Sequence, residues 1–398
     1  MPRYASSFSA VLAVTCLALS AIVSNTQAQT AATGPRWRLQ HGRDLQASLP
    51  LARNTSPRAL PAGVPAKLDD VRFEWPAGAP TDFETYRKAI SVDGFIVLKD
   101  GKVVFERYYD GFGPRGAHNW ASMSKSIVGV LALRLAKQGV IDLNAPLARY
   151  IPELAETPFG AASVQQNLNM RVSVAYPSNL PPDRGLFAAA GLAPAPPGAP
   201  ATIHDFLKAA LPGAGAHGET FYYQNGSTEA VAWALERASD KPLAELVEQQ
   251  IWSPMGAADD GYYLADRAQT AFAAGGVFST LRDLARFGEF ARRGLNAAGD
   301  GDLAKRLQGW DDAPTSASDH FHYRDFWWRG HRGAFALGRY GQRLAVIPDK
   351  NIVIAQFAAY EDERPRATST PDASKPKTAD LRDGEAFEAL ALAIAARF

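Results

Sequence analysis

The stretch SMSKSIVGVLALRLAKQG at residues 122–139 carries the pattern from which the fold can be worked out. Its apolar residues recur at four-residue intervals, at Ile127, Leu131 and Leu135. This spacing places them on one face of an α-helix, and Gly139 is a typical helix terminator. Ser122 and Lys125 stand three residues apart at the start, so the Nζ atom of the lysine can reach the Oγ atom of the serine. The sequence predicts a buried helix that begins with a serine–lysine pair.

The pairing of Ser122 with Lys125 suits nucleophilic catalysis. Backbone N–H groups left unpaired at a helix N-terminus stabilise the oxyanion that forms when a serine attacks a carbonyl. A lysine buried beside Ile127 and Val128 can lose its proton near neutral pH and act as the base. The pattern alone is not specific, because Ser122 can also be an N-cap with an exposed Lys125 one turn later. A second copy, at residues 374–377, lies in a polar stretch that contains proline.

Strand patterns occur near both ends of the chain. GFIVLKDGKVVFERYY at residues 94–109 predicts a β-hairpin that turns at Asp100-Gly101. Two further strands and a terminal amphipathic helix are predicted at residues 341–346, 351–357 and 386–397. Because the strands flank the helices in sequence, we expect one antiparallel sheet built from both ends of the chain.

Helical patterns fill the middle of the chain. They occupy residues 204–211, 229–238, 244–252 and 281–293. The proline-rich segment 177–200 has little periodicity and is predicted to be a loop, either a lid or a plain surface loop. The predicted fold is therefore α/β, in the α+β sense: an antiparallel sheet flanked by helices, with a mostly helical subdomain at about residues 146–269.

The first 28 residues have the features of a secretory signal peptide. Arg3 gives a positive start, residues 8–23 are apolar or small, and Thr26 and Ala28 stand at the small-residue positions of a cleavage site. The apolar run is shorter than the roughly 20 residues that a membrane span needs. We expect export, cleavage before residue 29, no stable membrane anchor after cleavage, and a periplasmic or secreted mature protein. Residues 29–85 are expected to form an N-terminal extension ahead of a hydrolase-like domain at 86–398.

Composition excludes several classes of protein. Of the 398 residues, 46% are hydrophobic and 21% are charged, which is ordinary for a globular chain. Lys and Arg total 42 against 41 Asp and Glu, so no excess of charge favours a nucleic acid as partner. The single cysteine excludes a disulfide framework, and the scattered histidines give no metal-ligand spacing. We predict no metal and no organic cofactor.

A second group of polar residues lies in the segment GETFYYQNGSTEAVAWALE. Tyr223 and Asn225 form a Y-x-N pattern just before a predicted helix. A phenol and a carboxamide on one short turn can both face a serine nucleophile: Tyr223 can pass a proton to the leaving group, and Asn225 can hold Lys125 or a substrate carbonyl. The alternative is a packed aromatic patch that Asn225 caps.

A third candidate lies in the glycine-rich entry to the late strands. The segment WWRGHRGAFALGRYGQRLAVIPDK allows a substrate to approach the backbone closely. His331, Arg332 and Gly333 are candidates for the position opposite the nucleophile. A glycine-rich loop between packed tryptophans explains the segment about equally well.

Taken in this order, the S-x-x-K, Y-x-N and glycine-rich strand patterns resemble those of the serine β-lactamase and penicillin-binding superfamily. The chain is most similar to the class C β-lactamase-related hydrolases, which include esterases, D-aminopeptidases and 6-aminohexanoate-dimer hydrolases. The similarity extends over roughly residues 86–398, through the segments 122–154, 274–290 and 338–357. It implies the β-lactamase/transpeptidase-like fold.

The resemblance also implies roles for particular residues. Ser122 matches the acylated serine, Lys125 the lysine that helps to deprotonate it, and Tyr223 and Asn225 the first and third positions of the second motif. The third motif departs from the family, because the K-T-G of its β-lactamases is absent. Family spacing places this motif at Gly333-Ala334-Phe335, whereas residue type favours His331-Arg332-Gly333.

The implied function is a serine hydrolase that cleaves a small ester or amide through an acyl-enzyme on Ser122. Without the lysine of K-T-G, which binds a β-lactam carboxylate, the esterase or amidase branch is favoured. The alternatives are a β-lactamase or penicillin-binding sensor that acylates with little turnover, and an interaction module in which the motif has no catalytic role.

Overall fold

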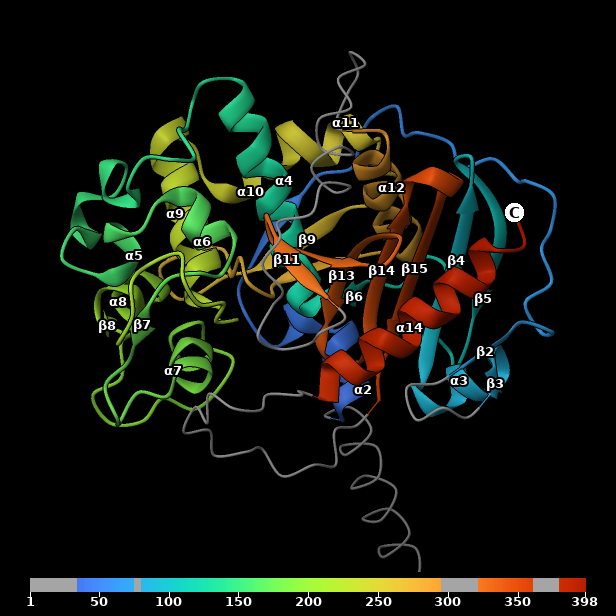
Figure 1. Ribbon diagram of the computed structural model, residues 1–398, viewed down its shortest axis with the longest axis horizontal. Coiled ribbons are helices and arrows are strands. Elements are labelled where there is room, and N and C mark those ends of the chain that lie inside the picture. The colour runs from blue at the N-terminus through green and yellow to red at the C-terminus, as the bar shows by residue number, and fades with distance from the viewer. Residues whose placement is uncertain (1–33, 75–79, 295–320, 361–378) are drawn as a thin grey trace, which may run out of the picture.

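The predicted hairpin is present and anchors the main sheet. Strands β4 (Val92–Lys99) and β5 (Lys102–Tyr108) are joined by Asp100 and Gly101, which both have positive φ angles, as a tight hairpin turn requires. The structure is a computed structural model that describes residues 34–74, 80–294, 321–360 and 379–398 (Figure 1). The predicted signal peptide and the second S-x-x-K copy lie outside these ranges.

The main sheet has seven strands in the order β11-β12-β13-β14-β15-β4-β5, and all neighbours are antiparallel. The late strands are β11 (His322–Arg324), β12 (Trp327–Gly330), β13 (Gly333–Gly338), β14 (Gln342–Ile347) and β15 (Ile352–Ala358). Short 3-10 turns, Arg339–Gly341 and Pro348–Lys350, link the last three. Strand β15 pairs with β4, with Val353 opposite Leu98, so the two ends of the chain close one sheet. The predicted antiparallel arrangement is confirmed.

Helices cover both faces of this sheet. Helix α14 (Ala379–Ala395) lies across one face, where Phe387 meets Phe335 of β13 (Figure 1). Helix α12 (Leu281–Arg292) packs on the other face, where Gly288 lies against Leu344 and Val353. Strands β13, β14, β15 and β4 are buried almost throughout, which explains why their sequences are nearly continuous apolar runs.

The quoted stretch forms helix α4 (Ser124–Lys137), which is preceded by a 3-10 turn, η2 (Ala121–Met123). The helix is buried from Ser124 through Leu133, and Figure 1 shows it between the sheet and the helical part of the molecule. Gly139 has a positive φ just beyond its end, as the sequence predicts.

Replacing Gly129 by alanine is expected to destabilise the fold by about 3 kcal/mol. Overpacking a closed interface typically costs about 1–3 kcal/mol, and the cost here is at the upper end because the new methyl group would collide with backbone atoms, which cannot easily move away. A Cβ atom at Gly129 would lie 2.1 Å from the carbonyl oxygen of Asp325. Gly113 is the matched control, since a Cβ there would meet nothing within 4 Å. Chemical denaturation of both variants tests this, and equal stabilities would contradict the packing.

The helical region lies on one side of the sheet (Figure 1). Its elements are η3 (Leu147–Arg149), η4 (Pro152–Leu154), α5 (Pro158–Ala161), α6 (Val164–Leu168), α7 (Pro182–Ala189), α8 (Ile203–Lys208), α9 (Gly226–Ser239), α10 (Leu243–Val247), the π-helical η5 (Glu248–Trp252) and α11 (Ser253–Met255). A two-stranded ribbon, β7 (Val174–Ala175) with β8 (Leu211–Pro212), lies among them. The prediction that 177–200 is only loop is wrong, because α7 forms inside it around the buried Leu186.

The N-terminal extension wraps around the molecule. It contains α2 (Pro35–Gln40), η1 (Gly42–Asp44), β1 (Ser48–Leu51), the hairpin β2 (Arg72–Glu74) with β3 (Pro80–Asp82), and then α3 (Phe83–Ala89). Strand β1 joins a second sheet of order β1-β9-β10-β6, whose other members are β9 (Gly261–Leu264), β10 (Val277–Ser279) and β6 (His118–Asn119). Arg36 of α2 reaches the buried Asp93 at 2.9 Å, which ties the extension to β4.

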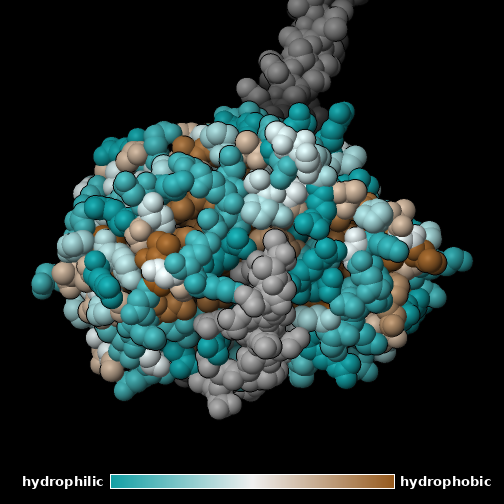
Figure 2. Space-filling model, turned by 90° about the horizontal axis from the view of Figure 1, so that it is seen from above, coloured by the Kyte–Doolittle hydropathy of each residue, from teal (hydrophilic) through white to brown (hydrophobic). Residues whose placement is uncertain are grey.

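The face shown in Figure 2 is mostly hydrophilic, and its hydrophobic residues gather in small separate patches. Among the described residues, no helix combines the length and the apolar character needed to cross a membrane.

Candidate functional site

Ser122 lies in the 3-10 turn η2, which leads directly into α4. The preceding Ala121 has a φ of 47°, a left-handed conformation that alanine rarely adopts. The Oδ1 atom of Asn119 accepts a hydrogen bond from the Ala121 N–H at 2.8 Å and so holds this turn. Local backbone strain of this kind persists where surrounding contacts impose it, often at functional sites. The turn leaves the half-buried Ser122 beside the first N–H groups of α4.

Lys125 is buried against this serine. Its Nζ atom donates hydrogen bonds to the Ser122 Oγ at 2.9 Å and to the Ala274 carbonyl oxygen at 2.8 Å. The side chain is 1% exposed, and burial lowers the pKa of Lys125 to about 7. A neutral amine therefore stands at hydrogen-bond distance from a serine hydroxyl near neutral pH, which is the arrangement of a general base and its nucleophile.

Glu229 of α9 supports the backbone that holds Lys125. It is 2% exposed, and its two carboxylate oxygens accept the N–H groups of Ala273 at 3.2 Å and Ala274 at 2.8 Å. Burial raises the pKa of Glu229, whereas these N–H groups and the charge of Lys125 favour its ionised form. The Ala274 peptide thus donates to Glu229 and accepts from Lys125, so one peptide unit connects the two buried ionisable groups.

Tyr223 faces the lysine. The Lys125 Nζ atom lies 5.2 Å from the centre of the Tyr223 ring. That ring stacks on Trp328 of β12, with centroids 5.5 Å apart, and meets Tyr323 of β11 edge-on at 5.8 Å. Tyr223 therefore lies in an aromatic cluster with Trp328 and Tyr323, which holds its ring beside the serine–lysine pair.

Asn225 does not hold Lys125 through any hydrogen bond seen among the described residues. Its Nδ2 atom instead donates to the Oδ1 atom of Asp183 at 2.9 Å. Asp183 lies on α7, and its charge acts on the pKa of Lys125, favouring the protonated form. Asn225 thus connects the start of α9 to the segment predicted as a loop.

The structure places His331 and Gly333 near the end of β13 that lies away from the η2 turn. Gly333 is the first residue of β13, and His331 lies in the turn before it, where its N–H donates to Glu388 of α14 at 2.6 Å. The other end of this six-residue strand lies about 17 Å away. It contains Gly338, which contacts the η2 turn. A Cβ atom at Gly338 would lie 2.6 Å from the Trp120 carbonyl oxygen and 3.2 Å from the Ala121 Cβ. The strand is the expected one, but its other end approaches Ser122.

No group of three or more His, Cys, Asp or Glu side chains in the described ranges is arranged to hold a metal ion. The residues that surround Ser122 supply a nucleophile, a base and a phenol, which suit acyl transfer.

Comparison with known proteins agrees with this chemistry. Residues 81–375 match the β-lactamase family. A 6-aminohexanoate-dimer hydrolase of Paenarthrobacter ureafaciens is 31% identical over 325 residues, which cover 76% of this chain and 80% of that protein. A D-alanyl-D-alanine-carboxypeptidase/endopeptidase, AmpH, of Escherichia coli K12 is 30% identical over 42% of this chain and 46% of its own length.

Solved structures give the same result. A Bacillus anthracis protein assigned as a 6-aminohexanoate-dimer hydrolase superposes with a TM-score of 0.79 at 28% identity, over 91% of this chain and 94% of that one. A D-stereospecific amidohydrolase from Streptomyces shares the fold, with a TM-score of 0.53 at 16% identity over 70% of this chain and 94% of that one. The resemblance predicted from the motifs is confirmed, and the chain belongs to the β-lactamase family of serine hydrolases.

Proposed function

We propose that this protein hydrolyses small linear amides or esters through an acyl-enzyme on Ser122. The observation that carries the proposal is the 2.9 Å hydrogen bond from the Lys125 Nζ to the Ser122 Oγ, made by a lysine whose burial brings its pKa to about 7. The 6-aminohexanoate-dimer hydrolase that is 31% identical supports a small amide as the substrate class.

In the proposed reaction, Lys125 accepts the Ser122 Oγ proton as that oxygen attacks the substrate carbonyl carbon. The tetrahedral oxyanion is stabilised by backbone N–H groups of the η2 turn and of the strand end at Gly338, which contacts that turn. When the carbon–nitrogen or carbon–oxygen bond breaks, the leaving group takes a proton from Tyr223, which Lys125 re-protonates. Water then attacks the acyl carbon and gives a proton to Lys125, and Lys125 passes that proton to the Ser122 Oγ as the acyl carbon–Oγ bond breaks.

The substrate side of the site favours simple acyl groups over β-lactams. Strand β13 ends in Ala336, Leu337 and Gly338 and so carries no lysine at the end that contacts the η2 turn. One lost charge-assisted hydrogen bond costs roughly 1.5–3 kcal/mol, which is about ten- to a hundredfold in rate.

The test is a comparison of kcat/KM for p-nitrophenyl butyrate, the linear dimer of 6-aminohexanoate and a chromogenic cephalosporin. We expect the ester or the amide to be turned over at least tenfold more efficiently than the cephalosporin. Equal efficiency on the cephalosporin, or a stoichiometric burst without turnover on all three, would contradict the proposal and favour a β-lactamase or a penicillin-binding sensor.

The substitution Glu229→Gln is expected to move the acid limb of the kcat/KM profile to lower pH. The negative charge of Glu229 raises the pKa of Lys125, so its removal lowers that pKa and leaves the amine neutral at lower pH. Glutamine retains a carbonyl oxygen for one of the two alanine N–H groups. Glu236→Gln is the control on the same helix, since Glu236 bonds to the Leu243 N–H and not to the 273–274 backbone. An unmoved limb in Glu229→Gln would show that the two groups are not coupled.

We further propose that residues 1–28 direct export and are removed, which leaves a periplasmic or secreted enzyme. The charged start, the apolar run at 8–23 and the small residues at 26 and 28 support this. The division into an extension at 29–85 and a hydrolase domain at 86–398, with its helical insertion at about 146–269, is supported by the family match over 81–375. Mass spectrometry of the native N-terminus tests the cleavage: an intact Met1 on protein isolated from the cytosol would overturn it.

A further inference from the structure

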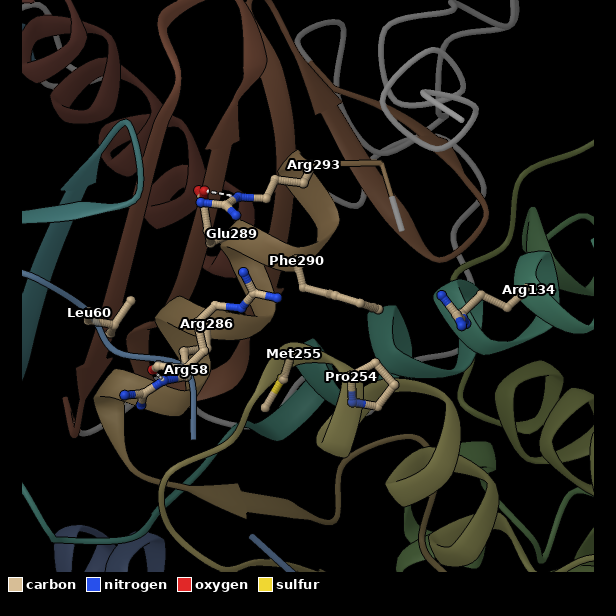
Figure 3. Close-up of a pocket in the computed structure, with 9 residues that line it drawn as sticks. All are labelled: Arg58, Leu60, Arg134, Pro254, Met255, Arg286, Glu289, Phe290 and Arg293. Carbon is tan, nitrogen blue, oxygen red and sulfur yellow. Dashed lines mark hydrogen bonds and ion pairs between the residues drawn. The ribbon is translucent and has the colours of Figure 1, made fainter. Parts of the chain in front are cut away.

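A cavity of about 310 Å³ lies between helices α4, α11 and α12, and its lining is rich in arginine (Figure 3). Helix α12 contributes three residues and its C-cap one, α11 two, α4 one and the N-terminal extension two. The lining residues are Arg58, Leu60, Arg134, Pro254, Met255, Arg286, Glu289, Phe290 and Arg293. From this lining we infer a binding site for a small organic anion, separate from the Ser122 site.

The cavity lining carries more cations than carboxylates. Four arginines line it, against the single carboxylate of Glu289. That carboxylate is already engaged, with ion pairs to Arg292 at 2.7 Å and to Arg293 at 2.6 Å. The four lining arginines thus stand against two carboxylates, that of Glu289 and that of Asp283, which pairs with Arg286. Planar guanidinium groups bind carboxylates and phosphates well.

Arg286 is the fixed element of the site. It is 6% exposed, and its Nε donates to the Arg58 carbonyl oxygen at 2.9 Å while its Nη1 pairs with Asp283 at 2.9 Å. Its Nη2 has no hydrogen-bond partner among the described residues. Two bonds thus fix the orientation of the guanidinium group, and one nitrogen remains to donate to a ligand.

Arg134 stands opposite, and the wall between the two cations is apolar. Figure 3 shows the guanidinium groups of Arg134 and Arg286 both directed toward Phe290. The Arg134 Cζ lies 5.7 Å from the centre of the Phe290 ring, and burial lowers the pKa of Arg134. Leu60 and Met255 add apolar surface. The lining fits an anion with a carboxylate or phosphate head and a short apolar body, and the volume is at the small end for ligand pockets.

The cavity is independent of the proposed reaction. Arg134 follows Lys125 by nine residues on α4, which is about 14 Å along a helix axis. A ligand in the cavity need not touch Ser122, so loss of activity and loss of anion binding can be measured separately.

Isothermal titration calorimetry with hexanoate, hexyl phosphate and 1-hexanol tests the site, because the three share a six-carbon body and differ in the head group. We expect at least one of the two anions to bind at least tenfold more tightly than hexanol. Comparing the affinities of hexanoate and hexyl phosphate shows which head group the site prefers. We also expect tenfold weaker binding of the preferred anion by Arg134→Gln and by Arg58→Gln. The Arg58 variant keeps the backbone carbonyl that orients Arg286.

Arg237→Gln is the matched control, because Arg237 is a surface arginine outside the cavity that pairs with Glu153. It should bind the anions as the wild type does. If hexanol binds as tightly as both anions, or if Arg134→Gln and Arg58→Gln behave like Arg237→Gln, the site is not an anion site. Either result leaves the proposed hydrolase function untouched, since esterase activity of the same preparations is measured independently.

Discussion

The variant Ser122→Ala is expected to lose activity by about 10⁴-fold or more, because it lacks the atom that forms the acyl bond. The fold should survive, since Ser122 is half-buried in a 3-10 turn and the Oγ hydrogen bond from Lys125 is its one described side-chain bond. The measurement is kcat/KM on the best ester or amide, together with the melting temperature, which should change little.

Two observations separate loss of the nucleophile from general damage. Ser374→Ala, in the second S-x-x-K copy, should retain wild-type activity. A fluorophosphonate probe should label the peptide that contains Ser122 and no other. Ser124→Ala is a poorer control, because the Ser124 Oγ donates to the Ala121 carbonyl at 2.7 Å and accepts from the Val277 N–H at 3.2 Å. Labelling elsewhere, or full activity in Ser122→Ala, would overturn the assignment of the nucleophile.

Features of the site that depend on local sequence could be predicted. The hairpin turn at Asp100-Gly101 and the serine–lysine pair on one helix face follow from spacing within a few residues. The placement of Tyr223 beside that pair followed from family resemblance, and the structure gives the physical reason. Its ring is held by stacking on Trp328, more than 100 residues later in the chain.

The third element of the site could not be located from sequence. Glycines occur at both ends of β13, and residue type alone favoured His331 and Gly333. The deciding fact is steric: only the Gly338 end approaches the Trp120–Ala121 backbone closely enough that a side chain would collide. Such a contact arises when the sheet packs on the η2 turn, and it leaves no periodic signal in the sequence.

The groups that hold Lys125 in place could not be predicted from the sequence either. Its second partner is the backbone carbonyl of Ala274, and side-chain patterns carry no information on carbonyl positions. Glu229 lies on the helix predicted at 229–238, in a segment whose other early positions are apolar. A charged residue on the buried face of a predicted helix was the available signal, because such groups are rarely buried without a structural or functional role.

The substitution Lys125→Met is expected to lower activity by about 10²–10⁴-fold, the usual contribution of a general base. The acid limb near pH 7 that reports Lys125 should also disappear from the residual activity. Methionine has nearly the same length and shape, so helix α4 remains packed while the amine is lost. The pH profile of kcat/KM for the wild type and the variant measures both effects.

The same substitution is expected to make the protein more stable at neutral pH. The pKa of Lys125 is 10.5 when unfolded and about 7 when buried, so between these values the unfolded chain binds a proton that the folded chain does not. Wild-type stability therefore rises with pH through this window, and below pH 7 the fold bears the full cost of a buried ammonium. That cost is about 4 kcal/mol near neutrality, whereas leaving the Ala274 carbonyl without a donor costs about 1–3 kcal/mol.

The cost of the buried ammonium exceeds the cost of the unpaired Ala274 carbonyl. The Lys125→Met variant should therefore be about 2 kcal/mol more stable than the wild type at pH 6–7. Its advantage should shrink as the pH rises toward 10.5, where the wild-type lysine is neutral in both states. Lys137→Met, at the exposed end of the same helix, should leave stability within about 0.5 kcal/mol at every pH. Urea denaturation at pH 6, 8 and 10 distinguishes the outcomes. If Lys125→Met is less stable than the wild type at pH 6, the hydrogen bonds of the buried ammonium stabilise the fold by more than its burial costs. Lys125 would then stay protonated near neutral pH and could not act as the base.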